Sequence, residues 1–345
     1  MVDGMTYGTP RAAAPGPLPT RDDVRKLLAT RNAVLLAHYY QESEIQDLAD
    51  FVGDSLELAR RAMETDADVI VLAGVHFMAE TAKILNPSKT VLLPDLNAGC
   101  SLAESAPAYL FRAFRERHPD HLALTYINCT AEVKSLSDII VTSSSAERIL
   151  AQIPREIPIL FSPDKNLGRY LSKKYDRDML LWQGTCSVHE QFSGEKIRML
   201  KLEHPSAEVL AHPECEDAVL EMADFIGSTS GLLAHTQRSS ASAFIVATEV
   251  GILHQMQRAR PDRTFIPAPP ESSCACNECP FMKLNTLEKL HACLRDMEPR
   301  IELAPDLMHS ARASIDRMLA LSGAEASERR RDVLASIRLP FTAGR

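Results

Sequence analysis

Three short strings in this sequence share one pattern: DFVGDS at residues 50–55, DIIVTS at 138–143 and DFIGST at 224–229. Each string begins with an aspartate, ends with a small hydroxyl residue and follows a short apolar run. Short apolar runs that alternate with helical patterns are typical of parallel β-strands covered by helices on both faces. The recurrence of this chemistry at nearly equal intervals therefore indicates three copies of one α/β unit.

The repeat predicts an α/β fold of three similar three-layer αβα units, whose parallel sheets are arranged about a pseudo-threefold axis. We expect a flexible leader, three units and C-terminal helices packed on the fold, with rough limits at residues 1–20, 21–105, 106–190, 191–300 and 301–345. In parallel α/β sheets, ligands bind beyond the carboxyl ends of the strands. The polar residues at those ends should therefore converge on one central cavity.

Composition and charge argue against several classes of protein. The chain has 345 residues, with 38 Lys and Arg against 46 Asp and Glu, and its net charge of −8 gives no reason to expect a nucleic-acid partner. No apolar run approaches the roughly 18 residues of a membrane span, and the first residues lack the apolar centre of a signal peptide. We therefore expect a cytoplasmic protein without a membrane partner, whose 8 cysteines are reduced.

The hydroxyl residues that end the three strings are Ser55, Ser143 and Thr229. Taken one at a time, such a residue is more often a helix N-cap than a ligand-binding group. The two roles are compatible, because the N-terminus of a helix also attracts anions. We interpret the aspartates that begin the strings as structural residues that end a helix or fix a turn.

Cysteines give the strongest metal-binding signal. Residues 274–279 form a C-x-C-x-x-C string, which suits either zinc or an iron–sulfur cluster, and Cys100 and Cys186 each follow a strand run in one of the first two units. One thiolate from each unit would make a three-cysteine site that leaves one iron of a [4Fe-4S] cluster open. Spacing alone does not decide which cysteine of the third unit takes part. The remaining cysteines follow no shared series and are predicted to be small buried residues: Cys129, Cys215 and Cys293.

Longer strings connect these residues to a known family. They include AHYYQ at 37–41, LAGVHFMAETAKILNP at 72–87, AGCSLAE at 98–104, YINCTAEVKS at 126–135, WQGTCSVHE at 182–190, AHPEC at 211–215, ATEVGILH at 247–254 and CNECPFMKLNTLEKL at 276–290. Over about residues 21–305 the chain resembles the type A quinolinate synthases. This resemblance implies three α/β domains about a pseudo-threefold axis, with a [4Fe-4S] cluster on the axis.

Members of this family join iminoaspartate to dihydroxyacetone phosphate to give quinolinate, phosphate and water in de novo NAD biosynthesis. The resemblance implies the same transferase reaction here, an open iron that acts as a Lewis acid in dehydration, and a functional link to L-aspartate oxidase. It assigns the cluster ligands to Cys100, Cys186 and Cys279, the last being the cysteine before Pro280. Some members carry C-x-x-C-x-x-C in this third segment. With the shorter spacing found here, a disulfide between Cys274 and Cys276 is not expected.

The resemblance also assigns a substrate pocket. Its substrate-binding residues are His38, Ser55, Tyr126, Asn128, Ser143, His189, His212, Glu214 and Thr229, and its catalytic residues are Tyr40, Tyr126, His212 and Glu214. Neutral hydroxyl and amide donors would hold the two carboxylates of the imine, and His212 with Glu214 would move protons in a keto–aldo isomerisation. Tyr40 is preferred over Tyr39 because strand alternation gives it the same facing as His38.

Three other classes of protein fit part of the pattern. Another [4Fe-4S] hydro-lyase would also use an open iron, but it would need no phosphate site. A non-enzymatic, cluster-based redox sensor or cluster carrier would not need polar groups at three repeated strand ends. A zinc-stabilised binding module would hold zinc and show no visible absorption.

Overall fold

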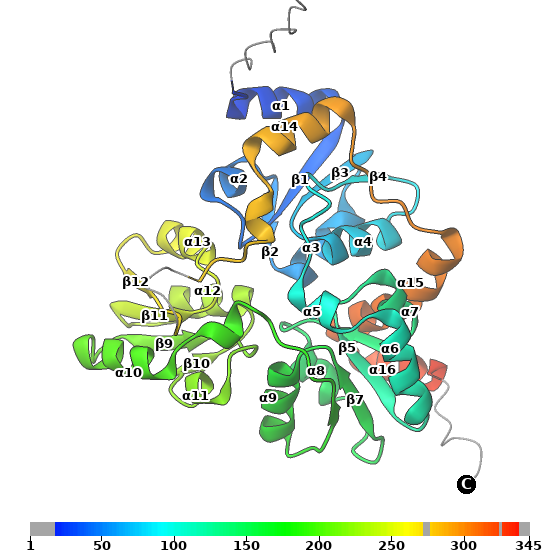
Figure 1. The fold of residues 1–345 in the computed structure, drawn as a ribbon, viewed down its shortest axis with the longest axis vertical. Helices are drawn as coiled ribbons and strands as arrows, with labels where there is room; N and C mark the ends of the chain where they lie inside the picture. Colours follow the sequence, from blue (N-terminus) through cyan, green and yellow to red (C-terminus); the bar gives the residue numbers. More distant parts are fainter. Residues whose placement is uncertain (1–17, 272–276, 324–325, 338–345) are drawn as a thin grey trace, which may run out of the picture.

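Each of the three repeated strings contributes the edge strand of its own four-stranded sheet, and each sheet forms one lobe of the molecule (Figure 1). The computed structural model describes residues 18–271, 277–323 and 326–337. The three sheets share one strand order, namely β2-β1-β3-β4, β6-β5-β7-β8 and β10-β9-β11-β12, and all of these strand pairs are parallel. The predicted fold of three αβα units with parallel sheets is therefore confirmed.

The strands are short, as the apolar runs predict. Their bounds are β1 Ala33–His38, β2 Phe51–Gly53, β3 Val69–Ala73, β4 Thr90–Leu92, β5 Leu122–Tyr126, β6 Ile139–Val141, β7 Ile159–Ser162, β8 Leu180–Leu181, β9 Glu208–Ala211, β10 Phe225–Ile226, β11 Ala243–Ala247 and β12 Thr264–Pro267. The central strands are buried, because helices cover both faces of each sheet.

The helices follow the strands along the chain. Those of the first unit are α1 Arg21–Thr30, α2 Ser43–Leu48, α3 Ser55–Glu64, α4 His76–Leu85 and α5 Ser101–Ser105. Those of the second are α6 Ala108–Arg117, α7 Ala131–Ser135, α8 Ala146–Leu150 and α9 Lys165–Tyr175, followed by the 3₁₀ turn η1 His189–Gln191. The rest are α10 Gly194–Glu203, α11 Asp217–Leu220, α12 Thr229–Arg238, α13 Ile252–Ala259, η2 Met282–Leu284, α14 Leu287–Asp296, α15 Pro305–Ser322 and α16 Ala326–Ser336.

Some of the sequence predictions fall on residues for which no structure is described. These are residues 1–17 of the predicted leader, together with Cys274 and Cys276 of the C-x-C-x-x-C string. Of the helices within the described ranges, none combines the length and the apolar character that crossing a membrane requires.

The three repeated aspartates have the same structural role. A carboxylate oxygen of Asp50 accepts a hydrogen bond from the backbone N–H of Leu35 at 2.7 Å. Asp138 does the same for Ala123, and Asp224 for Val209, each at 2.8 Å. Each aspartate thus joins the start of an edge strand to the central strand beside it. The prediction that these aspartates are structural is confirmed.

The hydroxyl residues that end the strings are not helix caps, so the capping interpretation was wrong for all three. Asp54 caps α3 by accepting from the N–H groups of Leu56 and Glu57, which makes Ser55 the first residue of the helix. Ser228 caps α12 in the same way, and Ser143 lies two residues before the N-cap position of α8. Because the preceding residue satisfies the helix N-terminus, the hydroxyls of Ser55 and Thr229 are not needed for capping.

Two helices that follow the third sheet, α14 and α15, pack against the first and second units. Leu287 and Leu290 of α14 belong to the same buried cluster as Val24 and Leu28 of α1, and the two helices lie side by side in Figure 1. Further on, α15 buries one face against α7 and β6, and the hydroxyl of Ser314 donates to the carbonyl of Lys134 at 2.8 Å. Thus α14, which lies within the range predicted for the third unit, packs on the first unit, and α15 packs on the second.

One carboxylate connects the three units directly. An oxygen of Asp54, from the first unit, accepts a hydrogen bond from Ser144 of the second unit and another, at 2.6 Å, from Ser230 of the third. Ser144 directly follows Ser143, and Ser230 directly follows Thr229. The side chain of Asp54 is 4% exposed, so these two hydroxyls replace water that the carboxylate would otherwise bind. The contact therefore holds the N-terminal ends of α3 and α12 together with the loop that precedes α8.

We expect Ser144→Ala and Ser230→Ala each to lower the free energy of unfolding by about 1–3 kcal/mol, because each removes a donor from a buried carboxylate. Urea unfolding followed by circular dichroism would measure the change. Ser310→Ala is the matched control, since this exposed serine bonds only to a carbonyl of its own helix, and its effect should stay within about 0.5 kcal/mol. Two variants no less stable than this control would contradict the role given to Asp54.

Candidate active site

A cavity lies where the three units meet. All of the residues that the sequence indicated as ligands, substrate-binding groups or catalytic groups line it: His38, Tyr40, Ser55, Cys100, Tyr126, Asn128, Ser143, Cys186, His189, His212, Glu214, Thr229 and Cys279. Apolar side chains complete the wall, among them Val75, Phe77, Met78 and Phe281. No arginine or lysine is found among the lining residues of the described structure.

The repeat explains why these residues meet. His38 ends β1, Tyr126 ends β5 and His212 directly follows β9, so all three stand at the carboxyl ends of equivalent strands. The register brings Gly53 beside His38 and Val141 beside Tyr126. Ser55 and Ser143 then follow these partners at the same offset. Parallel sheets present such residues on one edge, and the edges of the three sheets face a common space.

Glu214 is the centre of the polar network in the cavity. It accepts a short hydrogen bond from the hydroxyl of Tyr126, and its other oxygen lies 3.0 Å from Nδ1 of His189. Burial alone would raise the pKa of Glu214, but the neighbouring His212 and His189, with the hydrogen bond from Tyr126, hold it below its usual value. Glu214 is therefore a carboxylate at neutral pH, although it is only 3% exposed.

The other histidines of the cavity are neutral at physiological pH. Burial lowers the pKa of His38 to about 4 and that of His212 to about 3. The ring of His212 lies 4.7 Å from that of His189, centroid to centroid. A neutral imidazole can accept a proton, so both residues are suited to the role of general base.

Tyr40 and Tyr39 point to different surroundings. The hydroxyl of Tyr40 lies in the cavity wall, 2.9 Å from Oγ1 of Thr229 and 2.8 Å from Oγ1 of Thr248. The hydroxyl of Tyr39 instead donates to Glu57 at 3.2 Å, and Tyr39 does not line the cavity. Burial raises the pKa of Tyr40 well above its usual value, so its hydroxyl keeps its proton.

Several cavity groups have no partner within the described part of the chain. The amide oxygen of Asn128 is buried and accepts no hydrogen bond, and the side-chain hydroxyls of Ser55 and Ser143 make none. A polar group left unsatisfied in a buried site is costly unless a ligand completes it. These three residues are therefore suited to binding a polar ligand.

Two residues near the cavity were missed by the sequence reasoning. Thr248 bonds to Tyr40 and, at 2.9 Å, to Nε2 of His189. Asp164 is fully buried, one of its carboxylate oxygens has no partner among the described residues, and burial together with the charge of Glu214 raises its pKa well above its usual value. Both follow strand ends, β11 and β7, so the rule that selected His38 and Tyr126 would also have selected them.

The three cysteines of the cavity share one local structure. Burial raises the pKa of Cys100 to about 12, that of Cys186 well above its usual value and that of Cys279 to a lesser degree. In each case the backbone N–H groups two and three residues further along the chain act against this increase, because they favour a thiolate: Leu102 and Ala103, Val188 and His189, and Phe281 and Met282. Three thiols of different units thus stand in equivalent turns, each with backbone donors for a thiolate.

This arrangement fits a multi-iron group better than a single ion. All three thiols are partly exposed, and the charge of one influences the pKa of another, as for Cys100 with Cys279 and Cys186 with Cys100. Among the described residues, only one set of three Cys, His, Asp or Glu donors lies within 4.8 Å of one another, and that set is not the three thiols. The three thiols are therefore too far apart to bind one ion together. A cluster of several irons is larger, and thiolates with backbone hydrogen bonds are its usual ligands.

The fold and the cavity together define an α/β enzyme of three similar units, with buried acid–base groups and thiols free for a metal group. The chain belongs to the family described as Quinolinate synthetase A protein, whose sequence profile matches residues 22–320. A protein of Nostoc punctiforme named quinolinate synthase is 60% identical over 299 residues, which cover 87% of this chain and 92% of the relative. A protein of the same name from Thermosynechococcus vestitus is 59% identical over 309 residues, which cover 89% of this chain and 97% of the relative. Another, from Chloroherpeton thalassium, is 59% identical over 302 residues, which cover 87% of this chain and 94% of the relative.

Proposed function

We propose that this chain is a quinolinate synthase that condenses iminoaspartate with dihydroxyacetone phosphate to give quinolinate, phosphate and water in de novo NAD biosynthesis. The observation that carries the proposal is the convergence, in one cavity, of every residue that the family resemblance implicates. The proposal includes cytoplasmic action and a supply of iminoaspartate by L-aspartate oxidase.

Cys100, Cys186 and Cys279 would hold a [4Fe-4S] cluster, since they provide one partly exposed thiol from each of three equivalent turns. When bound, such a cluster would supply one iron without a protein thiolate, a Lewis acid for dehydration. The three thiols would bind it as thiolates, and the backbone N–H groups of the turns would stabilise their charge.

Substrate binding would rely on neutral donors and on a helix N-terminus. The two substrates carry carboxylates and a phosphate, yet no cationic Lys or Arg side chain lines the described cavity. The ten-residue helix α12 begins at Thr229, a lining residue, and its N-cap is the neutral Ser228, so the positive end of its dipole lies beside the cavity. With the side-chain NH₂ group of Asn128, which also lines the cavity, these groups would hold anions without a fixed countercharge.

The acid–base groups would act on carbon and oxygen during the keto–aldo isomerisation. His212, which is neutral, would accept a proton, and Tyr126, which donates to Glu214, would hold or donate a proton at a substrate oxygen. Glu214 would keep both neighbours oriented, because its oxygens face Tyr126 and His189. Tyr40 would also donate to the substrate, and the hydroxyls of Thr229 and Thr248 would fix its position.

The direct test is quinolinate formation by the anaerobically purified chain, with iminoaspartate generated in place from aspartate and with dihydroxyacetone phosphate added. We expect quinolinate only when both substrates are present, and we expect it to disappear after exposure to air. Protein with full iron and sulfide content that makes no quinolinate would refute the proposal and direct attention to other hydro-lyases.

The ligand assignment predicts that Cys100→Ala, Cys186→Ala and Cys279→Ala each lose the cluster, as measured by iron and sulfide content and by visible absorption. Cys274→Ala should keep it. Cys293→Ala is a second control, because Cys293 is buried in α14 and does not line the cavity. Full iron and sulfide in Cys279→Ala would overturn the assignment.

The two neighbouring tyrosines offer a matched pair of variants. We expect Tyr40→Phe to lower kcat by about 10²–10⁴-fold, the usual contribution of a positioned proton donor, while the iron content stays normal. Tyr39→Phe should leave kcat within about threefold, since the hydroxyl of Tyr39 faces Glu57 outside the cavity. Initial rates of quinolinate formation would measure both, and equal rates in the two variants would remove Tyr40 from the catalytic set.

A further inference from the structure

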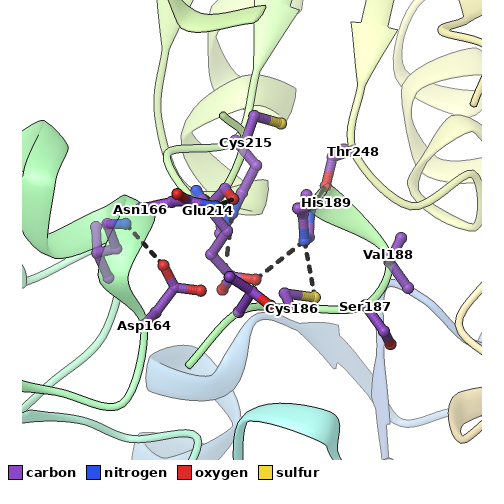
Figure 2. Close-up of polar contacts among 12 residues, drawn as sticks. Asp164, Asn166, Cys186, Ser187, Val188, His189, Glu214, Cys215 and Thr248 are labelled. Atoms are coloured by element: carbon purple, nitrogen blue, oxygen red, sulfur yellow. Dashed lines mark hydrogen bonds and ion pairs between the residues drawn. The ribbon is translucent and has the colours of Figure 1, made fainter. Parts of the chain in front are cut away.

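Three donor atoms inside the cavity converge on one point. Sγ of Cys186, Nδ1 of His189 and a carboxylate oxygen of Glu214 all lie within 4.8 Å of one another (Figure 2). Nδ1 of His189 is 3.2 Å from the sulfur and 3.0 Å from the carboxylate oxygen. Cys186 and Glu214 lie in loops that follow β8 and β9, His189 begins η1, and His189 and Glu214 are almost fully buried.

This arrangement is not that of a proton relay between a thiol and a carboxylate. In a nucleophile–histidine–carboxylate triad the two partners occupy opposite ring nitrogens, so that the imidazole passes a proton from one to the other. Here the thiol and the carboxylate share Nδ1, and Nε2 bonds to Thr248 instead (Figure 2). The two separations from Nδ1, 3.2 and 3.0 Å, are close to the edges of a tetrahedral metal site with bonds of roughly 2.0–2.3 Å, and all three donors lie within 4.8 Å of one another.

Each of the three donor groups also has a hydrogen-bond partner that orients it. The hydroxyl of Thr248 lies 2.9 Å from Nε2 of His189 and fixes the ring. Tyr126 donates to the other carboxylate oxygen of Glu214, and backbone N–H groups of residues 188 and 189 face the sulfur of Cys186. Partners of this kind orient metal ligands and increase their affinity.

We propose that Cys186, His189 and Glu214 form a binding site for a single divalent ion of the zinc class in the chain without its cluster. A set of one sulfur, one nitrogen and one oxygen donor suits such a borderline-soft ion, and a fourth position would stay open toward the cavity. The other two cavity thiols do not join this set within 4.8 Å, so the ion binds one thiolate only.

A consequence follows for cluster assembly. Cys186 belongs both to this site and to the proposed cluster site, so the ion and the cluster exclude each other. This consequence rests on the proposed function, whereas the metal site itself does not. A zinc-class ion bound here would hold the chain in a form that can neither accept the cluster nor use His189 and Glu214 in catalysis.

Co²⁺ is the probe, because a tetrahedral Co²⁺ ion absorbs visible light. When one of its ligands is a thiolate, it also shows a thiolate-to-metal charge-transfer band. The chain would be prepared without iron and sulfide and titrated with Co²⁺ in a buffer free of competing thiols. We expect one Co²⁺ per chain with a charge-transfer band, which Zn²⁺ abolishes by displacement. Cys186→Ser should lose the band, and His189→Gln and Glu214→Gln should each weaken binding by at least about tenfold.

The double variant Cys100→Ser/Cys279→Ser is the decisive control, since it lacks two of the three proposed cluster ligands. It should still bind one Co²⁺ with the thiolate band. Thr248→Val should weaken binding by about tenfold, whereas Thr236→Val should not, because that buried hydroxyl donates only to the carbonyl of Leu233 in its own helix. Circular dichroism would establish that each variant is folded.

Three results would overturn the proposal: no Co²⁺ bound by the folded chain, loss of the band in the double variant, or a band that persists in Cys186→Ser. The second would place the ion at the three thiols, and the third would place it outside the cavity. None of them bears on quinolinate formation by the cluster-loaded chain, so failure of this proposal and failure of the proposed function are distinguishable.

Discussion

The buried carboxylate of Asp54 is the contact on which the cavity depends. A carboxylate removed from water needs donors, and these come from Ser144 and Ser230, one from each of the other two units. Because each serine stands directly after a cavity residue, the same contact sets the positions of Ser143 and Thr229. Asp54 also caps α3 and so fixes Ser55. One side chain therefore aligns three sheets that share no strand, and the strand ends face each other as a result.

The cavity that results is polar but contains no cationic side chain among its described lining. Its groups satisfy one another: Tyr126 and His189 bind Glu214, and Thr248 connects His189 to Tyr40. Such a network leaves few polar atoms unpaired among the described residues, and an unpaired one marks where a ligand would bind, as at the amide oxygen of Asn128. Burial lowers the pKa of His38 and His212 and raises the pKa of Tyr40 and Tyr126, which separates proton acceptors from proton donors without a cationic Lys or Arg side chain among the described lining.

The repeat was sufficient for the fold and for the strand-end residues of the cavity, whereas Tyr40, His189, Glu214 and Cys279 were assigned by the family resemblance. Side-chain period and strand direction place His38, Tyr126 and His212 at equivalent edges, so one rule finds all three. Capping was harder to predict, since either Asp54 or Ser55 can cap a helix and only the backbone decides. The convergence of Cys186, His189 and Glu214 was out of reach for a different reason: it depends on the relative placement of two units, which no local pattern encodes.

The path of the chain between Cys279 and α14 has a consequence for the order in which the protein is made. The third cavity thiol stands just before the segment that leaves the third unit and returns to α1 in the first. The N-terminal helix therefore lacks its packing partner until residues 287–296 have been synthesised. During translation, the face of α1 that α14 covers therefore stays exposed while most of the chain is synthesised. The first core and the set of three cavity thiols are therefore completed by neighbouring segments of the chain, at nearly the same point of synthesis.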